Sequence, residues 1–130
     1  HGQAFPLASL CAGNAALIAF LQPGGEPTEH FLNELYDAYE RLSAVCRVVI
    51  VLPSSGSSSP AYARFADKYG RIDTYIDADE VQEPLARAAF KEPGDYPLLF
   101  LMGGYPDCRF ASAGYSVGSV ELIIKLAALI

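Results

Sequence analysis

Thiols are the first groups in this sequence that could do chemistry, and three cysteines carry them: Cys11, Cys46 and Cys108. Their spacing matches neither the Cys-x-x-Cys pair of a dithiol nor the clustered ligands of a zinc site. An odd number leaves at least one thiol free or paired between chains. Cysteine also commonly acts as a small buried hydrophobic residue. The cysteine pattern therefore predicts no dithiol and no metal site.

Acid and base side chains gather in one short segment that holds Glu26, Thr28, Glu29 and His30. One hypothesis is that Glu26 or His30 acts as a general base on the Thr28 hydroxyl. The structural alternative is that both glutamates complement the positive end of a helix dipole and that His30 is solvated. His1 is the one other histidine, so the side chains do not cluster at metal-ligand spacing and we expect no metal site. We also expect no cofactor.

The segment Gly114-Tyr115-Ser116-Val117-Gly118 matches the G-x-S-x-G pattern of hydrolase nucleophiles. That mechanism needs a histidine later in the chain than the serine, and no histidine follows Gly118. We therefore interpret the segment as a glycine-rich turn and helix cap.

Composition narrows the class of protein. The 130 residues are 52% hydrophobic, which predicts one globular domain over residues 1–130. A net charge of −6 and a pI near 4.7 argue against a nucleic-acid surface. The apolar runs are strand-sized, so we expect no membrane-spanning segment. The chain starts at His1-Gly2 without methionine, and we expect residues 1–4 to be a flexible or artificial start.

The stretch that must position any site is Ala15–Leu21, a continuous apolar run typical of a strand covered on both faces. Gln22-Pro23-Gly24-Gly25 ends it, because proline donates no ladder hydrogen bond and glycines favour a turn. Glu26-Pro27-Thr28-Glu29 then predicts a helix start, with proline in the first turn. Backbone N–H groups at such a helix start can stabilise an anion.

Periodicity and breakers predict the remaining elements. Helices are expected over Thr28–Leu42, from Pro60 to Tyr69 with Ser59 as cap and Gly70 beyond its end, over Glu83–Phe90 and over Val117–Leu129. Strands are expected at Arg47–Leu52, Ile72–Ile76, Leu98–Met102 and Arg109–Ala113, the last two forming a hairpin.

The segment from Phe20 to Glu29 resembles the active-site segment of thioredoxin-like proteins, in the branch of thiol-disulfide oxidoreductases and alkyl hydroperoxide reductases (redoxins). There, a Cys-x-Pro-Cys motif stands at the helix start, and Gly25-Glu26-Pro27-Thr28 keeps its spacing and proline. Tyr96-Pro97 before a strand matches the cis-proline that faces the dithiol. The resemblance extends from Phe5 to the last helix.

The resemblance implies an α/β fold, a thioredoxin-like three-layer α/β/α sandwich with helices on both faces of a five-stranded mixed sheet. The C-terminal hairpin is antiparallel. The implied strand order is Ile72–Ile76, Arg47–Leu52, Ala15–Leu21, Leu98–Met102, Arg109–Ala113. Members of this branch are commonly exported in bacteria, so an extracytoplasmic, envelope-associated location is expected by resemblance.

The chain departs from the motif at both cysteine positions, which hold Gly25 and Thr28. Disulfide exchange requires a thiolate nucleophile, so the site is degenerate and no residue in it is expected to be catalytic. We expect a redox-inactive module, structural or binding a protein or extended peptide beside Tyr96 and Pro97 by strand addition. The alternative is a thiol-disulfide oxidoreductase or peroxiredoxin-like enzyme that uses a non-standard cysteine, such as Cys108.

Two further hypotheses concern the chain as a whole. Cys11 and Cys46 each precede one of two adjacent parallel strands, so a structural disulfide could join them at the sheet edge opposite the turn. The missing N-terminal hairpin of the family also suggests a domain that packs against neighbours in a larger envelope protein.

Overall fold

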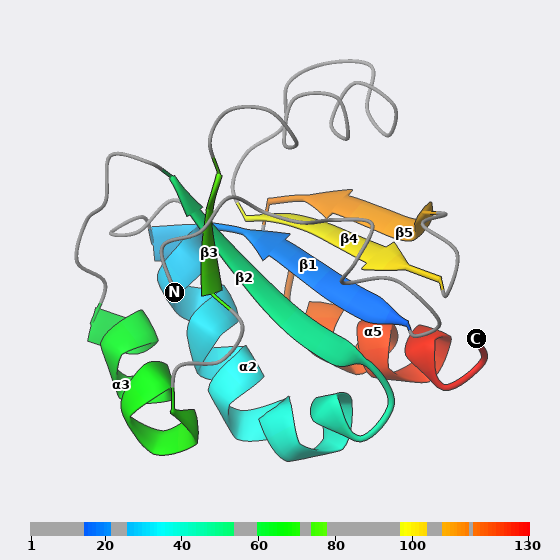
Figure 1. Cartoon of the computed structure of the whole chain (residues 1–130), viewed down its shortest axis with the longest axis horizontal. Coiled ribbons are helices and arrows are strands. Elements are labelled where there is room, and N and C mark those ends of the chain that lie inside the picture. The colour runs from blue at the N-terminus through cyan, green and yellow to red at the C-terminus, as the bar shows by residue number, and fades with distance from the viewer. Residues whose placement is uncertain are drawn as a thin grey trace.

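The computed structural model describes residues 15–21, 26–53, 60–70, 74–77, 97–103, 108–114 and 116–130 (Figure 1). In chain order its elements are β1 (Ala16–Phe20), α2 (Glu26–Ser43), β2 (Arg47–Pro53), α3 (Pro60–Tyr69), β3 (Thr74–Asp77), β4 (Leu98–Met102), β5 (Cys108–Ala113) and α5 (Ser119–Ala127). Residues 1–4 and the helix predicted over Glu83–Phe90 lie outside the described residues.

The sheet has five strands in the order β3-β2-β1-β4-β5. The β1–β2 and β2–β3 pairs are parallel, whereas the β1–β4 and β4–β5 pairs are antiparallel. The α/β class, the mixed sheet, its strand order and the C-terminal antiparallel hairpin are thus confirmed. The described edge strand β3 covers Thr74–Asp77 where Ile72–Ile76 was predicted.

Strand β1 lies at the centre of the sheet, and this position explains why its sequence is apolar without alternation. All five of its residues are at most 1% exposed. Leu17 and Ala19 belong to the core beneath the helices. The ring of Phe20 instead packs edge-on against Phe100 of β4, with 5.7 Å between ring centroids. Because both faces are buried, no polar residue is tolerated within the strand.

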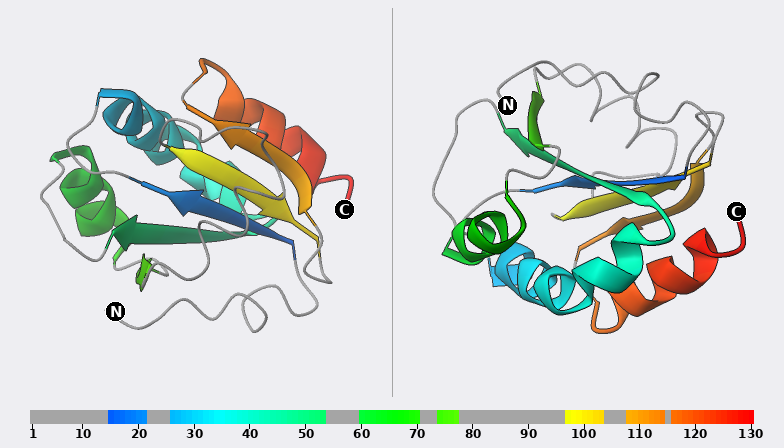
Figure 2. Two further views of the ribbon diagram at one scale, coloured as in Figure 1. Left: turned by 90° about the horizontal axis from the view of Figure 1, so that it is seen from above. Right: turned by 60° about the horizontal axis from the view of Figure 1, so that its bottom comes forward.

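Helix α2 begins at Glu26, two residues before the predicted start, and lies between α3 and α5 on one face of the sheet (Figure 2). Glu26 and Glu29 in its first turn complement the helix dipole as expected. Its buried side chains recur at helical spacing: Thr28, Phe31, Leu32, Leu35, Ala38 and Leu42. All the described helices lie on this face, and the helix predicted for a second layer falls outside the described residues.

Two polar contacts join α2 to α5. The Glu34 carboxylate accepts a hydrogen bond from the Val120 backbone N–H at 3.0 Å, which satisfies a donor in the first turn of α5. Arg41 donates to the Glu121 carboxylate through both terminal nitrogens of its guanidinium group, Nη1 and Nη2, with Nη1–Oε2 at 3.0 Å. This exposed ion pair lowers the pKa of Glu121 and raises that of Arg41.

Helix α5 is shorter than its predicted range. Gly118, with φ of 87°, adopts a left-handed conformation that a regular helix cannot include, so the helix begins at Ser119. At the other end, Leu129 N–H bonds to the carbonyl of Leu126, a tighter turn than the helix itself. Helix α3 matches its prediction, from Pro60 to Tyr69, and Gly70 follows with φ of 71°.

We predict that Leu99→Ala in β4 lowers the free energy of unfolding by about 2–5 kcal/mol, because Leu99 is fully buried and a cavity would remain. The matched variant Leu129→Ala removes the same atoms from a residue that is 83% exposed, and it should change stability by less than about 0.5 kcal/mol. Urea unfolding followed by circular dichroism measures both. Equal losses from the two variants would contradict the packing described here.

Candidate functional site

The candidate site lies where β1 ends and α2 begins. Leu21 is buried, Glu26 and Pro27 are exposed, and Thr28 is only 1% exposed. Gly25, the first position of the degenerate motif, lies outside the described residues, as does the turn from residue 22. The described part of the motif therefore offers a buried hydroxyl and an exposed proline, with no thiol in either place.

The hypothesis of a general base acting on Thr28 does not fit the geometry. His30 Nε2 lies 3.3 Å from Glu26 Oε1, one helical turn away, and both side chains are largely solvent-exposed. Residues two apart on a helix point in different directions. Thr28 accordingly faces the core, whereas Glu26 and His30 face water. The solvated arrangement expected for His30 and Glu26 is the one observed.

Pro97 lies at the same end of the sheet as this turn. It directly precedes β4, and Leu98, its neighbour, pairs with Phe20 at the end of β1. Pro97 is buried, and its carbonyl accepts a hydrogen bond from the Gly114 N–H at 3.0 Å, which extends the β4–β5 ladder by one bond. Tyr96 lies outside the described residues. The topology thus places Pro97 at the end of the sheet from which α2 starts.

The described cysteines lie at the opposite end of the sheet. Cys46 precedes Arg47, which pairs with Ala16 at the beginning of β1. Cys108 pairs with Met102, which also pairs with Ala16. Four residue steps of about 3.3 Å separate the two ends of β1, so about 13 Å of strand lies between these thiols and the turn. Neither thiol can act at the start of α2.

Cys46 is a free cysteine, so the disulfide predicted between Cys11 and Cys46 is not formed in the structure. Its Sγ lies 3.7 Å from the carbonyl of Leu42, in the tight connection between α2 and β2, where the thiol is 7% exposed. Burial raises the pKa of the Cys46 thiol to about 11. The thiol therefore behaves as a small core residue. Cys11 lies outside the described residues.

Cys108 is exposed, as predicted, but it forms the first residue of β5 instead of lying in the turn before it. Its Sγ lies 3.4 Å from the carbonyl of Phe110. The pairing register of β4 with β5 changes between Leu101 and Met102, so the ladder is irregular next to Cys108.

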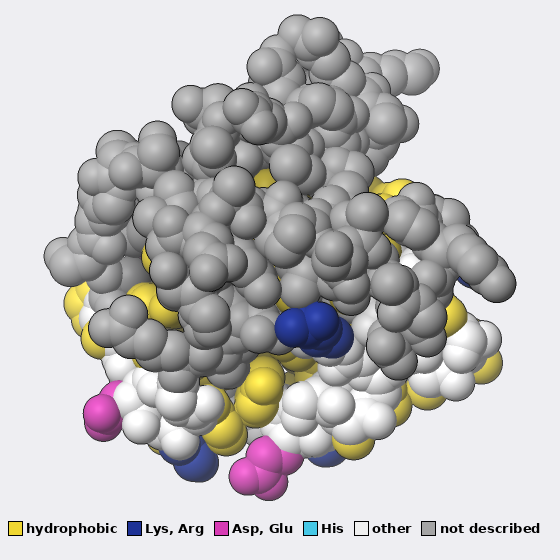
Figure 3. Space-filling view, in the orientation of Figure 1, with side chains coloured by type: hydrophobic (Ala, Val, Ile, Leu, Met, Phe, Trp, Pro, Cys, Tyr) yellow, Lys and Arg dark blue, Asp and Glu magenta, His cyan; other side chains and the backbone are white. Residues whose placement is uncertain are grey.

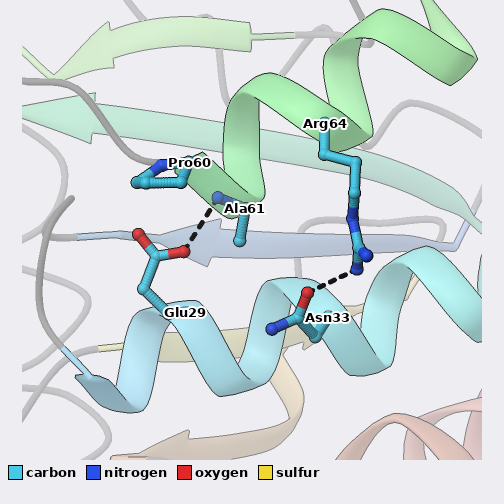
Figure 4. A pocket seen from close by; sticks show the side chains of 5 residues that line it. All are labelled: Glu29, Asn33, Pro60, Ala61 and Arg64. Atoms are coloured by element: carbon cyan, nitrogen blue, oxygen red, sulfur yellow. Dashed lines mark hydrogen bonds between the residues drawn. The ribbon is translucent and has the colours of Figure 1, made fainter.

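Figure 4 shows a shallow groove between α2 and α3 that sequence reasoning did not identify. It is lined by Glu29, Asn33, Pro60, Ala61 and Arg64. Glu29 Oε2 accepts a hydrogen bond from the Ala61 N–H at 3.0 Å, and Arg64 donates to the side-chain oxygen Oδ1 of Asn33. These polar groups bond to one another across the groove. The sequence gives no signal for this pairing, since the partners are about thirty positions apart.

The G-x-S-x-G segment is a helix start, as predicted. Gly114 and Gly118 have φ of 83° and 87°. The Ser116 carbonyl accepts two hydrogen bonds from Ser119, one from Oγ at 2.6 Å and one from the backbone N–H at 3.1 Å. These bonds close the turn before α5, whose N-cap residue is Gly118 and has no side-chain cap hydrogen bond.

Among the described residues, no cluster of histidine, cysteine and carboxylate side chains could hold a metal ion. No helix within the described ranges is long and apolar enough to span a membrane. On the face shown in Figure 3, the charged side chains of described residues are scattered and of both signs.

Comparison with known proteins identifies the fold. No family model and no curated protein matches the sequence. Among solved structures, a thiol:disulfide interchange protein of the thioredoxin family from Chlorobium tepidum has a TM-score of 0.69 at 12% identity, covering 93% of this chain and 84% of its own.

Two more solved structures agree. A secreted disulfide oxidoreductase from Mycobacterium tuberculosis has a TM-score of 0.64 at 17% identity, covering 95% of this chain and 86% of its own. An exposed lipoprotein thioredoxin from Streptococcus pneumoniae has a TM-score of 0.61 at 12% identity, covering 95% of this chain and 90% of its own. The chain therefore has the thioredoxin-like fold, and two of these three structures are named as a thiol:disulfide interchange protein and a disulfide oxidoreductase.

Proposed function

We propose that this chain is a thioredoxin-like module without dithiol chemistry, which binds a protein or an extended peptide beside Pro97. The observation that carries the proposal is the absence of cysteine at the start of α2, where Gly25 and Thr28 stand at the two motif positions. A helix N-terminus promotes disulfide exchange by stabilising a thiolate, and here there is no thiol to stabilise.

The positions of the remaining described thiols support the same conclusion. Cys46 is buried with a raised pKa, and Cys108 lies at the far end of the sheet from α2. A thiol with a high pKa carries little thiolate near neutral pH and is a slow nucleophile. The fold is therefore present without a nucleophile in the position that would use it.

Binding remains a function that this end of the sheet can serve. The start of β4 at Pro97 and the start of α2 lie at the same end of the sheet, and the Glu26–His30 pair lies exposed on the first turns of α2. Strand β4 is already paired on both sides, and the Pro97 carbonyl bonds to Gly114. An extended peptide would therefore bind across this end of the sheet, through backbone groups beyond the ladder, while exposed side chains such as Glu26 select its sequence. Two of the similar structures are named as a secreted and an exposed protein, which favours an extracytoplasmic location for this chain.

A second candidate function is thiol chemistry at Cys108, because its side chain is exposed. Such an enzyme would have to form its mixed disulfide on β5, away from the helix that activates the nucleophile in a dithiol site. We rank it below the binding function for this reason.

Thiol trapping separates these two candidates. We predict that a maleimide added to native protein near pH 8 labels Cys108 and leaves Cys46 unlabelled until a denaturant is added, as intact mass and peptide mapping would show. Burial of Cys46 and its raised pKa are the reasons. Peroxide or oxidised glutathione should shift the mass of Cys108 no faster than that of a model thiol peptide. A much faster shift at Cys108 would restore the enzyme hypothesis.

Peptide binding can be mapped directly. We predict that cysteine-free extended peptides added to ¹⁵N-labelled protein perturb the backbone amides of Glu26, Thr28, Glu29, Leu98 and Gly114, with little change in α5. Glu26→Lys, at an exposed position, should alter which peptide charges are preferred while leaving the circular dichroism spectrum unchanged. Perturbations confined to other parts of the molecule, or none at high peptide concentration, would refute the proposed groove.

Restoring both cysteines tests the correspondence of the turn. We predict that the double variant Gly25→Cys with Thr28→Cys forms an intramolecular disulfide and gains disulfide-reductase activity in the presence of a dithiol reductant. Each single variant is the matched control, because resolving a mixed disulfide requires the second thiol. If the folded double variant forms no internal disulfide, then these two positions do not correspond to the cysteines of a dithiol site.

A further inference from the structure

Helix α3 is held to α2 along a single face. The residues of α2 that make polar contacts with it include Glu29, Asn33 and Tyr36, which recur at spacings of four and three and so form one row along the helix. Figure 4 shows the first two of these contacts, with Glu29 and Asn33 on α2 pointing toward Ala61 and Arg64 on α3.

Each part of α3 has a polar link to this row. At its start, Glu29 accepts the Ala61 N–H, one of the donors that the first turn of a helix leaves unsatisfied. In its middle, the Arg64 guanidinium donates to Asn33 and stands 4.3 Å from the centroid of the Tyr36 ring. At its end, the Tyr69 hydroxyl donates to the Tyr36 carbonyl at 3.3 Å.

The apolar part of this attachment is smaller than that of α2. Helix α3 has two buried residues, Ala61 and Phe65, and two partly buried tyrosines, Tyr62 and Tyr69, whereas the buried face of α2 extends along its whole length. The Phe65 ring packs edge-on against Tyr39 at 5.2 Å and also contacts Tyr69 at 5.3 Å. Since buried apolar area supplies most of the packing free energy, α3 should be bound less strongly than α2 is to the sheet.

We propose that α3 is a detachable cover, which undocks from α2 as a unit while the sheet, α2 and α5 stay folded. Glu29 holds the start of α3 in place, because it belongs to the first turn of α2 and its carboxylate accepts the Ala61 N–H of α3. Undocking would expose Tyr36 and Tyr39 on α2 and the Phe65 ring on α3, of which Tyr39 and Phe65 pack against each other in the docked state. The inference does not depend on the proposed peptide groove.

Hydrogen exchange of the intact chain, read by mass spectrometry at several low denaturant concentrations, tests this inference. Amides of Ala61–Tyr69 should exchange through an opening that depends weakly on denaturant, whereas those of β1 and β4 should exchange only by global unfolding. Glu29→Gln replaces the charged carboxylate by a neutral amide oxygen, which accepts more weakly, and it should accelerate exchange in α3 about fivefold, the effect of weakening this cap by about 1 kcal/mol. The matched control is Asp37→Asn, an exposed acid on the same helix.

Two results would overturn the inference. One is that α3 amides exchange no faster than those of β1 and β4 in the unmodified protein. The other is that Glu29→Gln accelerates α2, β1 and α3 equally, which would make Glu29 a contributor to global stability only. If Glu29→Gln does not fold, Arg64→Ala replaces it, because it removes the middle link at an exposed residue and should accelerate the same amides.

Discussion

The packing of α2 on the central strands is the constraint on which the rest of the described structure depends. Its buried face, from Thr28 to Leu42, closes the core above β1, β2 and β4. Its flanks then position two other helices, because Glu29 caps the start of α3 and Glu34 caps the start of α5. One helix thus supplies both the apolar contact with the sheet and the carboxylates that orient its neighbours.

Burial of β1 on both faces decides where chemistry could occur in this fold. A strand without polar side chains offers no functional group along its length, so a site that uses β1 has to lie at one of its ends. The end at Phe20 carries the α2 N-terminus and Pro97, and the end at Ala16 carries the described cysteines. The start of α2 and the described thiols are therefore separated by the length of β1.

This separation matters because Gly25 and Thr28 stand at the two positions where the dithiol motif has cysteines. A missing motif could be offset by another thiol that reaches the same helix start, but neither Cys46 nor Cys108 is in reach of it. Thr28 keeps the inward direction of a side chain that packs in the core. The proposed peptide binding beside Pro97 requires no nucleophile, because backbone hydrogen bonds would supply the contact. Under that proposal, the fold serves recognition and not catalysis.

The sequence by itself predicted the described elements to within a few residues and determined the absence of thiols from the turn, while the order of the strands was implied by the resemblance that its motifs carry. Apolar runs, helical periodicity and glycine or proline breakers are local signals, and the identity of Gly25 and Thr28 is covalent. Only the tertiary structure decided that Cys46 is buried and free, that Cys108 begins β5, and that Glu29 and Glu34 cap helices distant in the sequence. Such pairings depend on strand register and helix crossing, which fix distances between residues that no local pattern relates.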